Sequence, residues 1–248
     1  MGSGAIFFSG CTLKCVYCQN RDISRNPIGS KMTDSELADL FLKLQDMGAH
    51  NINLVTPTHF TNNIVRALDL VKHKLSIPIV YNTSGYEKVE TLKKLSGYVD
   101  IYLPDFKYFD SYLSNKYSKA PNYFEVASSA VCEMYSQVGK YTEDETGILK
   151  KGMIIRHLVL PSCRKDSINV LENLKNILPI DDIRLSLMSQ FTPDFVSEEY
   201  PELSRRVTTF EYNSVLSKAI ELGFEGFFQD KDSAVTKYTP DFKTQNEM

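Results

Sequence analysis

The sequence lacks the segments that mark membrane and secreted proteins. No apolar run approaches the roughly 18 to 20 residues that a membrane-spanning helix needs. No apolar stretch with a small-residue cleavage site opens the chain, and low-complexity tracts are missing. We therefore expect a cytoplasmic protein with no membrane partner.

An excess of positive charge is missing as well. The 28 Lys and Arg residues are outnumbered by 31 Asp and Glu residues, which gives a formal net charge of −3. The chain carries no dense Lys/Arg stripe of the kind that tracks a phosphate backbone. Nucleic acid is therefore disfavoured as the main partner, and a protein or small-molecule substrate fits better.

The cysteines do not form the pattern of a disulfide framework. Their number is five, which is odd, and three of them fall within eight residues. This arrangement suits a metal site in a reducing compartment better than a set of disulfides.

What the chain has is a regular alternation of short β-rich runs and longer helical patterns, repeated about six times. This order is typical of βα units and a parallel sheet. The predicted strands are 5–8, 52–55, 77–81, 99–103, 153–160 and 183–188. The predicted helices are 33–48, 64–71, 86–95, 123–138, 167–178 and 208–222, and the first begins at a capping box.

Six βα units are too few for a closed eight-stranded barrel. We therefore predict an α/β fold of the partial (β/α)6, TIM-like barrel type, with a side gap that admits a large substrate. The even spread of hydrophobic residues, 42% of the total, favours a single domain over residues 1–248. Residues from about 233 to 248 are expected to form an irregular tail, and the polar stretch 140–151 is expected to form a loop.

The first loop of the predicted barrel carries three cysteines. Cys11, Cys15 and Cys18 have the spacing CxxxCxxC directly after the first strand. Thiolates suit iron–sulfur clusters, and a compact loop directs three of them at one cube, which leaves one iron of a [4Fe-4S] cluster open. A zinc site is the alternative, although structural zinc normally takes a fourth Cys or His and the nearest histidine is His50. Three buried free thiols are a further alternative.

Charged residues also follow or interrupt the predicted strands. Strand alternation places Asp105 and Lys107 on one face, and opposite charges inside a barrel mouth need each other or a ligand. Arg156 interrupts an apolar strand, where a cation needs a partner. Its neighbour His157 points to the other face and is expected to be structural.

The two remaining cysteines are not expected to be ligands. Cys132 falls on a predicted helix and is expected to be a packed thiol. Cys163 ends the fifth strand as a lone thiol, which is weak support for a second cluster.

The cysteine motif, its place after the first strand and the six βα units resemble the radical S-adenosylmethionine (SAM) superfamily. Several segments are also similar to the uncharacterised branch of the pyruvate formate-lyase activating enzyme family: GAIFFSGC at 4–11, CQN at 18–20, TPTHF at 56–60, YNTSGY at 81–86, YLPDFK at 102–107 and YTPDF at 238–242. The resemblance covers nearly the whole chain. Members of that branch often carry a cysteine-containing segment before the first strand, which this sequence lacks, so the resemblance implies a short form or a trimmed chain.

The resemblance implies the following chemistry. The open iron binds the amino and carboxylate groups of SAM, and an electron from the reduced cluster cleaves the S–C5′ bond to give methionine and a 5′-deoxyadenosyl radical. In activating enzymes this radical takes hydrogen from a glycine Cα, so the implied partner is a protein or peptide. The implied electron donor is a protein such as flavodoxin or ferredoxin.

The resemblance also implies contacts to the methionine part of SAM. In many relatives strand two ends in Gly-Gly-Glu, whose backbone and carboxylate take the amino group. Thr56 and Thr58 stand here instead, with hydroxyls but no carboxylate. Asn82, Thr83 and Ser84 occupy the end of strand three, near the methionine carboxylate in activating enzymes; a simple turn is the alternative.

Further positions are implied to hold the rest of the cofactor. Asp105 and Lys107 match an Asp-x-Lys pattern near the ribose and carboxylate, and Arg156 is a candidate for the cofactor carboxylate. Adenine contacts are implied before the third cysteine and at the end of strand six, that is at Tyr17, Met188 and Gln190. Packing in the core is the alternative for the tyrosine and the methionine.

Two other functions stay open at this point. A radical enzyme acting on a small molecule would need a capped pocket, and the stretch 140–151 is the only visible candidate for a lid. A metal-binding module for electron transfer or assembly would have no catalytic activity.

Overall fold

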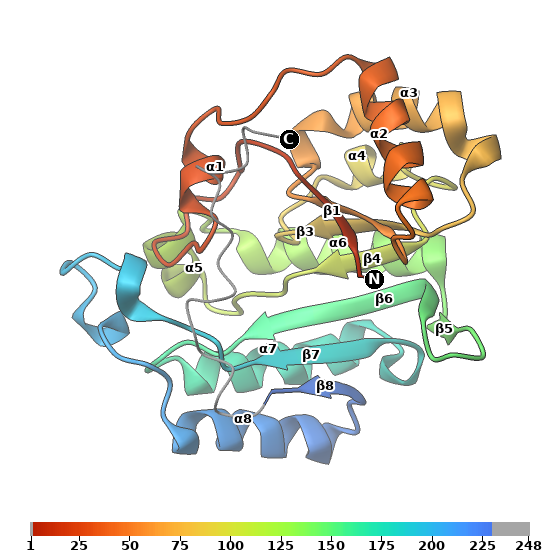
Figure 1. Cartoon of the computed structure of the whole chain (residues 1–248). Helices are drawn as coiled ribbons and strands as arrows, with labels where there is room; N and C mark the ends of the chain where they lie inside the picture. The colour runs from red at the N-terminus through yellow and green to blue at the C-terminus, as the bar shows by residue number, and fades with distance from the viewer. Residues whose placement is uncertain (1, 230–248) are drawn as a thin grey trace.

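The computed structural model describes residues 2–229, apart from the side chain of Phe195. Its centre is an eight-stranded sheet, in which the parallel strands stand in the order β1, β2, β3, β4, β6, β7, β8 and the short β5 pairs antiparallel with β6 (Figure 1). The strands are β1 (Gly4–Phe7), β2 (Ile52–Val55), β3 (Ile79–Thr83), β4 (Ile101–Pro104), β5 (Thr142–Glu143), β6 (Leu149–Leu158), β7 (Arg184–Met188) and β8 (Gly226–Phe228).

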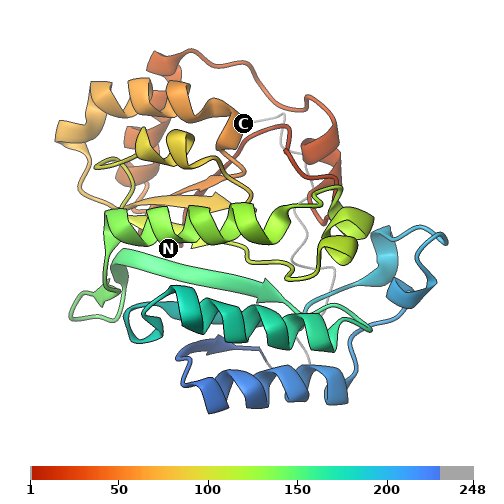
Figure 2. The same cartoon turned by 180° about the vertical axis from the view of Figure 1, so that it is seen from behind.

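The helices cover the sheet on its outer side. Figure 2 shows α6 in green, α7 in teal and α8 in blue lying next to one another across the sheet, and α2 packs on α3 near β1. The helices are α1 (Arg21–Arg25), α2 (Asp34–Asp46), α3 (Thr61–Val71), α4 (Val89–Lys93), α5 (Ser111–Ser118), α6 (Tyr123–Val138), α7 (Arg164–Ile177) and α8 (Thr209–Leu222). None of the helices within residues 2–229 is long and apolar enough to cross a membrane.

The predicted α/β fold with a parallel sheet is confirmed. β1 and β8 are the two ends of the strand order, so the sheet remains open as a partial barrel. The capping box predicted from Thr33 and Glu36 is also present: the Thr33 hydroxyl accepts from the Glu36 N–H at 3.2 Å, and Glu36 accepts from the Thr33 N–H at 2.7 Å. Such reciprocal bonds satisfy backbone donors that the first helical turn leaves free.

The interior has two hydrophobic clusters. The larger one joins β3, β4, β6 and β7 to α6, α7 and α8, and the smaller one joins β2 to α2 and α3. Both clusters bury side chains that recur at helical or alternating intervals along the sequence. This packing holds the carboxyl ends of the strands at one edge of the sheet.

Three local predictions were wrong. β8 adds a seventh parallel strand, because three exposed residues after α8 carry too little pattern to be recognised. α5 occupies the stretch between the predicted strand 99–103 and the predicted helix 123–138, where no helix was expected: the Asp110 side chain caps it by accepting from the Leu113 N–H at 3.0 Å. α4 spans five residues, about half of the predicted helix.

The polar stretch 140–151 is not a simple loop. β5 pairs with the first residues of β6, with Thr142 opposite Lys151, and β6 itself begins at Leu149. The turn between them is held by Asp144, whose carboxylate accepts from the Thr146 and Ile148 N–H groups at 2.9 and 3.0 Å. This hairpin therefore lies at the amino end of β6. The predicted irregular tail, residues 233–248, lies outside the described residues.

Candidate active site

The three cysteines of the CxxxCxxC motif lie in the loop that leaves β1. Cys15 is buried, whereas Cys11 and Cys18 are partly exposed. Contacts to the segment around α1 help to hold the loop: the Gly10 N–H donates to the Ile23 carbonyl at 2.9 Å, and Nη2 of Arg25 donates to the Cys15 carbonyl at 3.2 Å. All five cysteines, which lie within the described residues, are free thiols.

The three thiols line one cavity of about 320 Å³. Burial raises the pKa of Cys11 and raises that of Cys15 to about 11, and the neighbouring thiols add to both shifts. Desolvated thiolates so close together are costly unless a cation binds them. Within residues 2–229 no three His, Cys, Asp or Glu side chains already stand in a metal-binding arrangement. The thiols fit an iron–sulfur cluster by donor type, spacing and shared cavity.

The ends of four strands supply the polar wall of this cavity. Of the residues that the sequence implicates in cofactor binding, seven line it together with the thiols: Thr56, Asn82, Thr83, Ser84, Asp105, Lys107 and Arg156. They follow or end β2, β3 and β4, or lie on β6. Parallel strands thus bring together side chains that are far apart in sequence.

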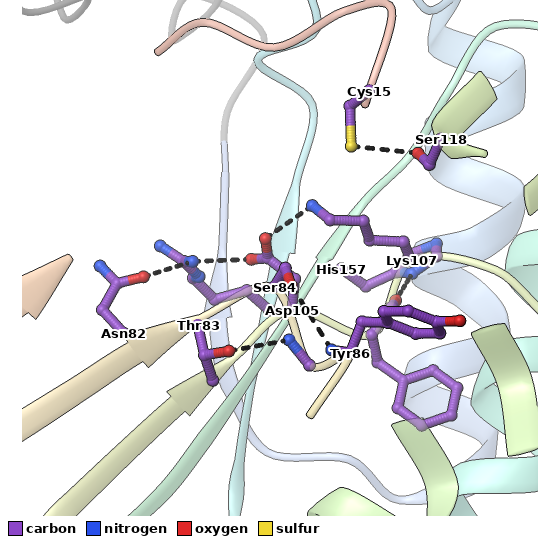
Figure 3. A network of polar contacts seen from close by, with 12 residues as sticks. Cys15, Asn82, Thr83, Ser84, Tyr86, Asp105, Lys107, Ser118 and His157 are labelled. Atoms are coloured by element: carbon purple, nitrogen blue, oxygen red, sulfur yellow. Dashed lines mark hydrogen bonds and ion pairs between the residues drawn. The ribbon is translucent and has the colours of Figure 1, made fainter. Parts of the chain in front are cut away.

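An ion network occupies the middle of this wall. The Asp105 carboxylate contacts Nζ of Lys107 at 2.6 Å and Nη2 of Arg156 at 2.7 Å, and Nη2 also donates to Oδ1 of Asn82 at 2.7 Å. Figure 3 shows Asp105 between Asn82 and Lys107. Burial favours the neutral acid, but the Arg156 and Lys107 cations outweigh it and lower the pKa of Asp105.

Arg156 has a buried donor left over from this network. Its buried Nε has no hydrogen-bond partner within the described part of the chain, and a buried donor without an acceptor is costly. A carboxylate in the cavity would satisfy it. The neighbouring His157 points away: it is buried, and its Nδ1 lies 2.7 Å from the Phe106 carbonyl.

Thr56 and Thr58 have different surroundings. Thr56 lines the cavity in a left-handed conformation, with φ of 57°, which is uncommon for a β-branched residue. Thr58 does not line it; its hydroxyl donates to Oε1 of Glu87 at 2.6 Å. Glu87 also accepts from Thr83, and its other carboxylate oxygen is buried without a partner among the described residues. Burial raises the pKa of Glu87.

The three positions expected to contact adenine lie outside the cavity lining. The Tyr17 side chain is buried, with its hydroxyl 2.6 Å from that of Tyr108 and its ring edge against Phe191. Nε2 of Gln190 lies 3.6 Å from Sδ of Met188. The adenine contacts of Tyr17, Met188 and Gln190 stay a prediction.

The other two cysteines are separate from the site. Cys132 is on a helix as predicted but is exposed rather than packed, because it lies on the outer side of α6 with Sγ 3.6 Å from the Ile177 carbonyl. Cys163 is buried at the start of α7, and burial raises its pKa to about 12. Neither thiol lines the cavity.

Several residues of the site were not predicted to take part in cofactor binding. Gln19, Asn20 and Ser24 line the cavity from the segment around α1, and Glu87 accepts from Thr83, which also lines it. Gln19 and Asn20 adjoin the cysteine motif, but Glu87 is recognisable only from the folded contacts.

The family model of the radical SAM superfamily matches residues 5–139, slightly more than half of the chain. The chain is 31% identical over 233 residues to the uncharacterised protein MJ0674 of Methanocaldococcus jannaschii, covering 89% of this chain and 61% of that protein. The chain thus spans less than two thirds of this curated relative.

Several solved structures share the fold of this chain. A radical SAM methyltransferase from Sphaerobacter thermophilus superposes with a TM-score of 0.58 at 14% identity, over 92% of this chain and 65% of that one. SuiB of Streptococcus suis bound to S-adenosylmethionine superposes with a TM-score of 0.60 at 12% identity, over 96% of this chain and 53% of SuiB. A spore photoproduct lyase superposes with a TM-score of 0.58 at 12% identity, over 88% of this chain and 73% of the lyase. The motif, the cavity, the open parallel sheet and the family match lead to one conclusion: the chain belongs to the radical SAM superfamily, whose cofactors are a [4Fe-4S] cluster and S-adenosylmethionine.

Proposed function

We propose that this enzyme acts on a protein or peptide and removes hydrogen from a glycine Cα, as activating enzymes of glycyl radical proteins do. The bound cofactors supply the 5′-deoxyadenosyl radical. The chain would hold the cluster through Cys11, Cys15 and Cys18. It would hold SAM through the strand-end residues, that is Thr56, Asn82, Thr83, Ser84, Asp105, Lys107 and Arg156.

The observation that carries this proposal is the size of the cavity. Its volume of about 320 Å³ is at the lower end of the range that holds one drug-sized ligand. The cluster and SAM would share that volume, so a second small molecule finds little room beside them. A substrate that approaches from outside, such as an extended peptide, needs only its reactive glycine to reach the cofactor.

The hairpin at 140–151 supports the same substrate class. A small-molecule enzyme would need a cap over the carboxyl ends of the strands, and this stretch was its candidate. The hairpin pairs with the amino end of β6 instead, with Thr142 opposite Lys151. It therefore lies at the other end of the strand from the cavity, and we no longer assign it as a lid.

The partners follow from the same chemistry. We propose a one-electron donor such as flavodoxin or ferredoxin for the cluster, and a reducing, cytoplasmic location, because the three ligands must remain thiols until the cluster forms.

A deuterium-transfer experiment tests the substrate class. The full chain is reconstituted anaerobically, reduced with dithionite and given SAM with a pool of peptides, each with one Cα-deuterated glycine between randomised residues. We expect deuterium in 5′-deoxyadenosine, detected by mass spectrometry, and none from a matched pool deuterated only in alanine methyl groups. Formation of 5′-deoxyadenosine without deuterium from the glycine pool would reject a peptide glycine as the hydrogen source and favour a small-molecule substrate.

A further inference from the structure

A buried chain of hydroxyl groups leads from the core to Cys15. The Tyr17 hydroxyl lies 2.6 Å from that of Tyr108, which lies 2.8 Å from Oγ of Ser118. Ser118 Oγ in turn donates to Sγ of Cys15 at 3.0 Å. All four side chains are buried. Figure 3 shows the last step, from Ser118 to Cys15, above the Asp105 and Lys107 pair.

The direction of each hydrogen bond in this series of hydroxyl groups is fixed once Cys15 is a metal ligand. A thiolate has no proton, so it only accepts, and Ser118 must give it its single hydroxyl hydrogen. Ser118 then accepts from Tyr108, which leaves Tyr108 to accept from Tyr17. Every hydroxyl hydrogen therefore points toward the Cys15 sulfur, and such aligned hydrogen bonds strengthen one another.

Backbone contacts hold the donor in place. The Lys14 N–H donates to the Ser118 carbonyl at 3.1 Å, and the Val16 N–H donates to the Tyr117 carbonyl at 2.9 Å. These bonds join the residues on both sides of Cys15 to the last turn of α5. They fix the backbones of Cys15 and Ser118 relative to each other, so the serine hydroxyl stays within reach of the Cys15 sulfur.

We propose that Ser118, oriented by Tyr108 and Tyr17, is a positioning residue that raises the reduction potential of the cluster through its hydrogen bond to Cys15. Reduction adds one electron to the cluster and makes its sulfur ligands more negative. A hydroxyl dipole aimed at one of these sulfurs stabilises the reduced form more than the oxidised form. The cluster then accepts its electron from a less strongly reducing donor.

A purely structural role makes a different prediction. Tyr17 and Tyr108 also pack edge-on against Phe191 and Tyr123, so their loss lowers stability in either case. Only the electrostatic role changes the potential, which makes the potential the decisive measurement.

The experiment is an EPR-monitored redox titration of the reconstituted full chain, without SAM. We expect a more negative potential in Ser118→Ala, a smaller shift of the same sign in Tyr108→Phe, and the smallest in Tyr17→Phe. Tyr102→Phe is the matched control, because Tyr102 is also buried and bonded through its hydroxyl, to Gln137 at 2.7 Å, but outside this chain. Its potential should equal that of the wild type.

Iron and sulfide content and circular dichroism confirm that each variant is folded and loaded. Ser118→Thr retains the hydroxyl and should return the potential toward the wild-type value. Resonance Raman spectra add a second readout, since loss of the bond should raise an Fe–S(Cys) stretching frequency. If Ser118→Ala does not fold, the reduction potential of Tyr108→Phe tests the proposal instead. This variant keeps the aromatic ring and removes the hydroxyl at the centre of the hydrogen-bonded series. A wild-type potential in the loaded variants overturns the proposal.

Discussion

Nη2 of Arg156 lies 2.7 Å from a carboxylate oxygen of Asp105 and 2.7 Å from Oδ1 of Asn82. One guanidinium group thus ties the carboxyl ends of β3 and β4 to β6 at the wall of the cavity. The same contact explains how an arginine is tolerated in an apolar strand, since a partly buried cation is stable when it is paired and hydrogen-bonded.

The first prediction concerns the charge of Asp105. In Asp105→Asn two cations lose their shared counter-charge, so the free energy of unfolding at pH 7 should fall by about 3 kcal/mol. The folded pKa of Asp105 lies below its unfolded value, about 4. Its stabilisation is therefore complete above that value and is lost as the pH falls through the folded pKa.

Urea unfolding of the cluster-free protein from pH 7 to pH 3 measures this difference. The difference in unfolding free energy between the wild type and Asp105→Asn should become smaller as the pH approaches 3. Asp34→Asn is the matched control, because Asp34 pairs with the exposed Arg66, and its loss should be smaller. A gap that stays constant with pH would contradict the assigned role of the Asp105 charge.

The second prediction concerns the backbone of Thr56. A β-branched residue at φ of 57° carries a conformational cost of about 1 kcal/mol that glycine avoids. Thr56→Gly should therefore be at least as stable as the wild type. It should also bind SAM about fivefold more weakly, because one polar contact in the cavity is worth about 1 kcal/mol.

Equilibrium dialysis of the reconstituted protein against SAM measures the affinity. Ser162→Gly is the matched control, since Ser162 also has a left-handed backbone, with φ of 64°, but does not line the cavity. Its SAM affinity should not change. Equal affinities of Thr56→Gly and wild type would remove Thr56 from the cofactor contacts.

The third prediction concerns Glu87, whose buried carboxyl accepts from Thr58 and Thr83. Burial raises its folded pKa, so the folded state binds this proton more tightly than the unfolded state. Stability is therefore lost as the pH rises from the unfolded pKa, about 4.3, toward the folded one. Glu87→Gln keeps the acceptor oxygen without the titration, so it should gain stability relative to the wild type between pH 4 and pH 8. If the unfolding free energies of the two proteins changed in parallel with pH over this range, Glu87 would not be held in its neutral form.

The sequence was sufficient for the fold class and for many of the residues that line the cavity. Parallel strands with apolar runs and helices with capping boxes carry strong local patterns, and the site follows from the strand ends because the topology places them at one edge. Asp105, Lys107 and Arg156 were recognisable as charges in apolar surroundings, which need partners.

The residues and the strand that were not predicted from the sequence have one physical reason in common. Ser118 lies 103 residues from the cysteine to which it donates, and Glu87 lies 29 residues from Thr58. A serine on a polar helix and a glutamate after a turn look like surface residues, and only the packing of α5 and of the loop after β3 buries them. β8 was missed because its three residues depend on β7 for their pairing rather than on a pattern of their own.

The last prediction concerns His157, the neighbour of Arg156 on the opposite face of β6. The Phe106 carbonyl only accepts, so Nδ1 carries the hydrogen of this bond, and Nε2 is buried with no partner among the described residues. Burial lowers the pKa of His157 to about 4. The unfolded state, with a pKa of about 6.5, binds this proton more readily. Stability is therefore lost as the pH falls from about 6.5 to about 4, by at most about 3 kcal/mol.

His157→Asn separates this titration from packing. The Asn amide takes the place of Nδ1 and donates to the same carbonyl, so the variant loses volume at every pH but no longer gains a proton on unfolding. Its unfolding free energy should be lower than that of the wild type at pH 7 and should depend less on pH between 6.5 and 4. His73→Asn is the control, because His73 is exposed, and its unfolding free energy should depend on pH as that of the wild type does. If His157→Asn were as sensitive to acid as the wild type, the loss of stability would have to come from other groups, and the buried Nε2 would have no part in it.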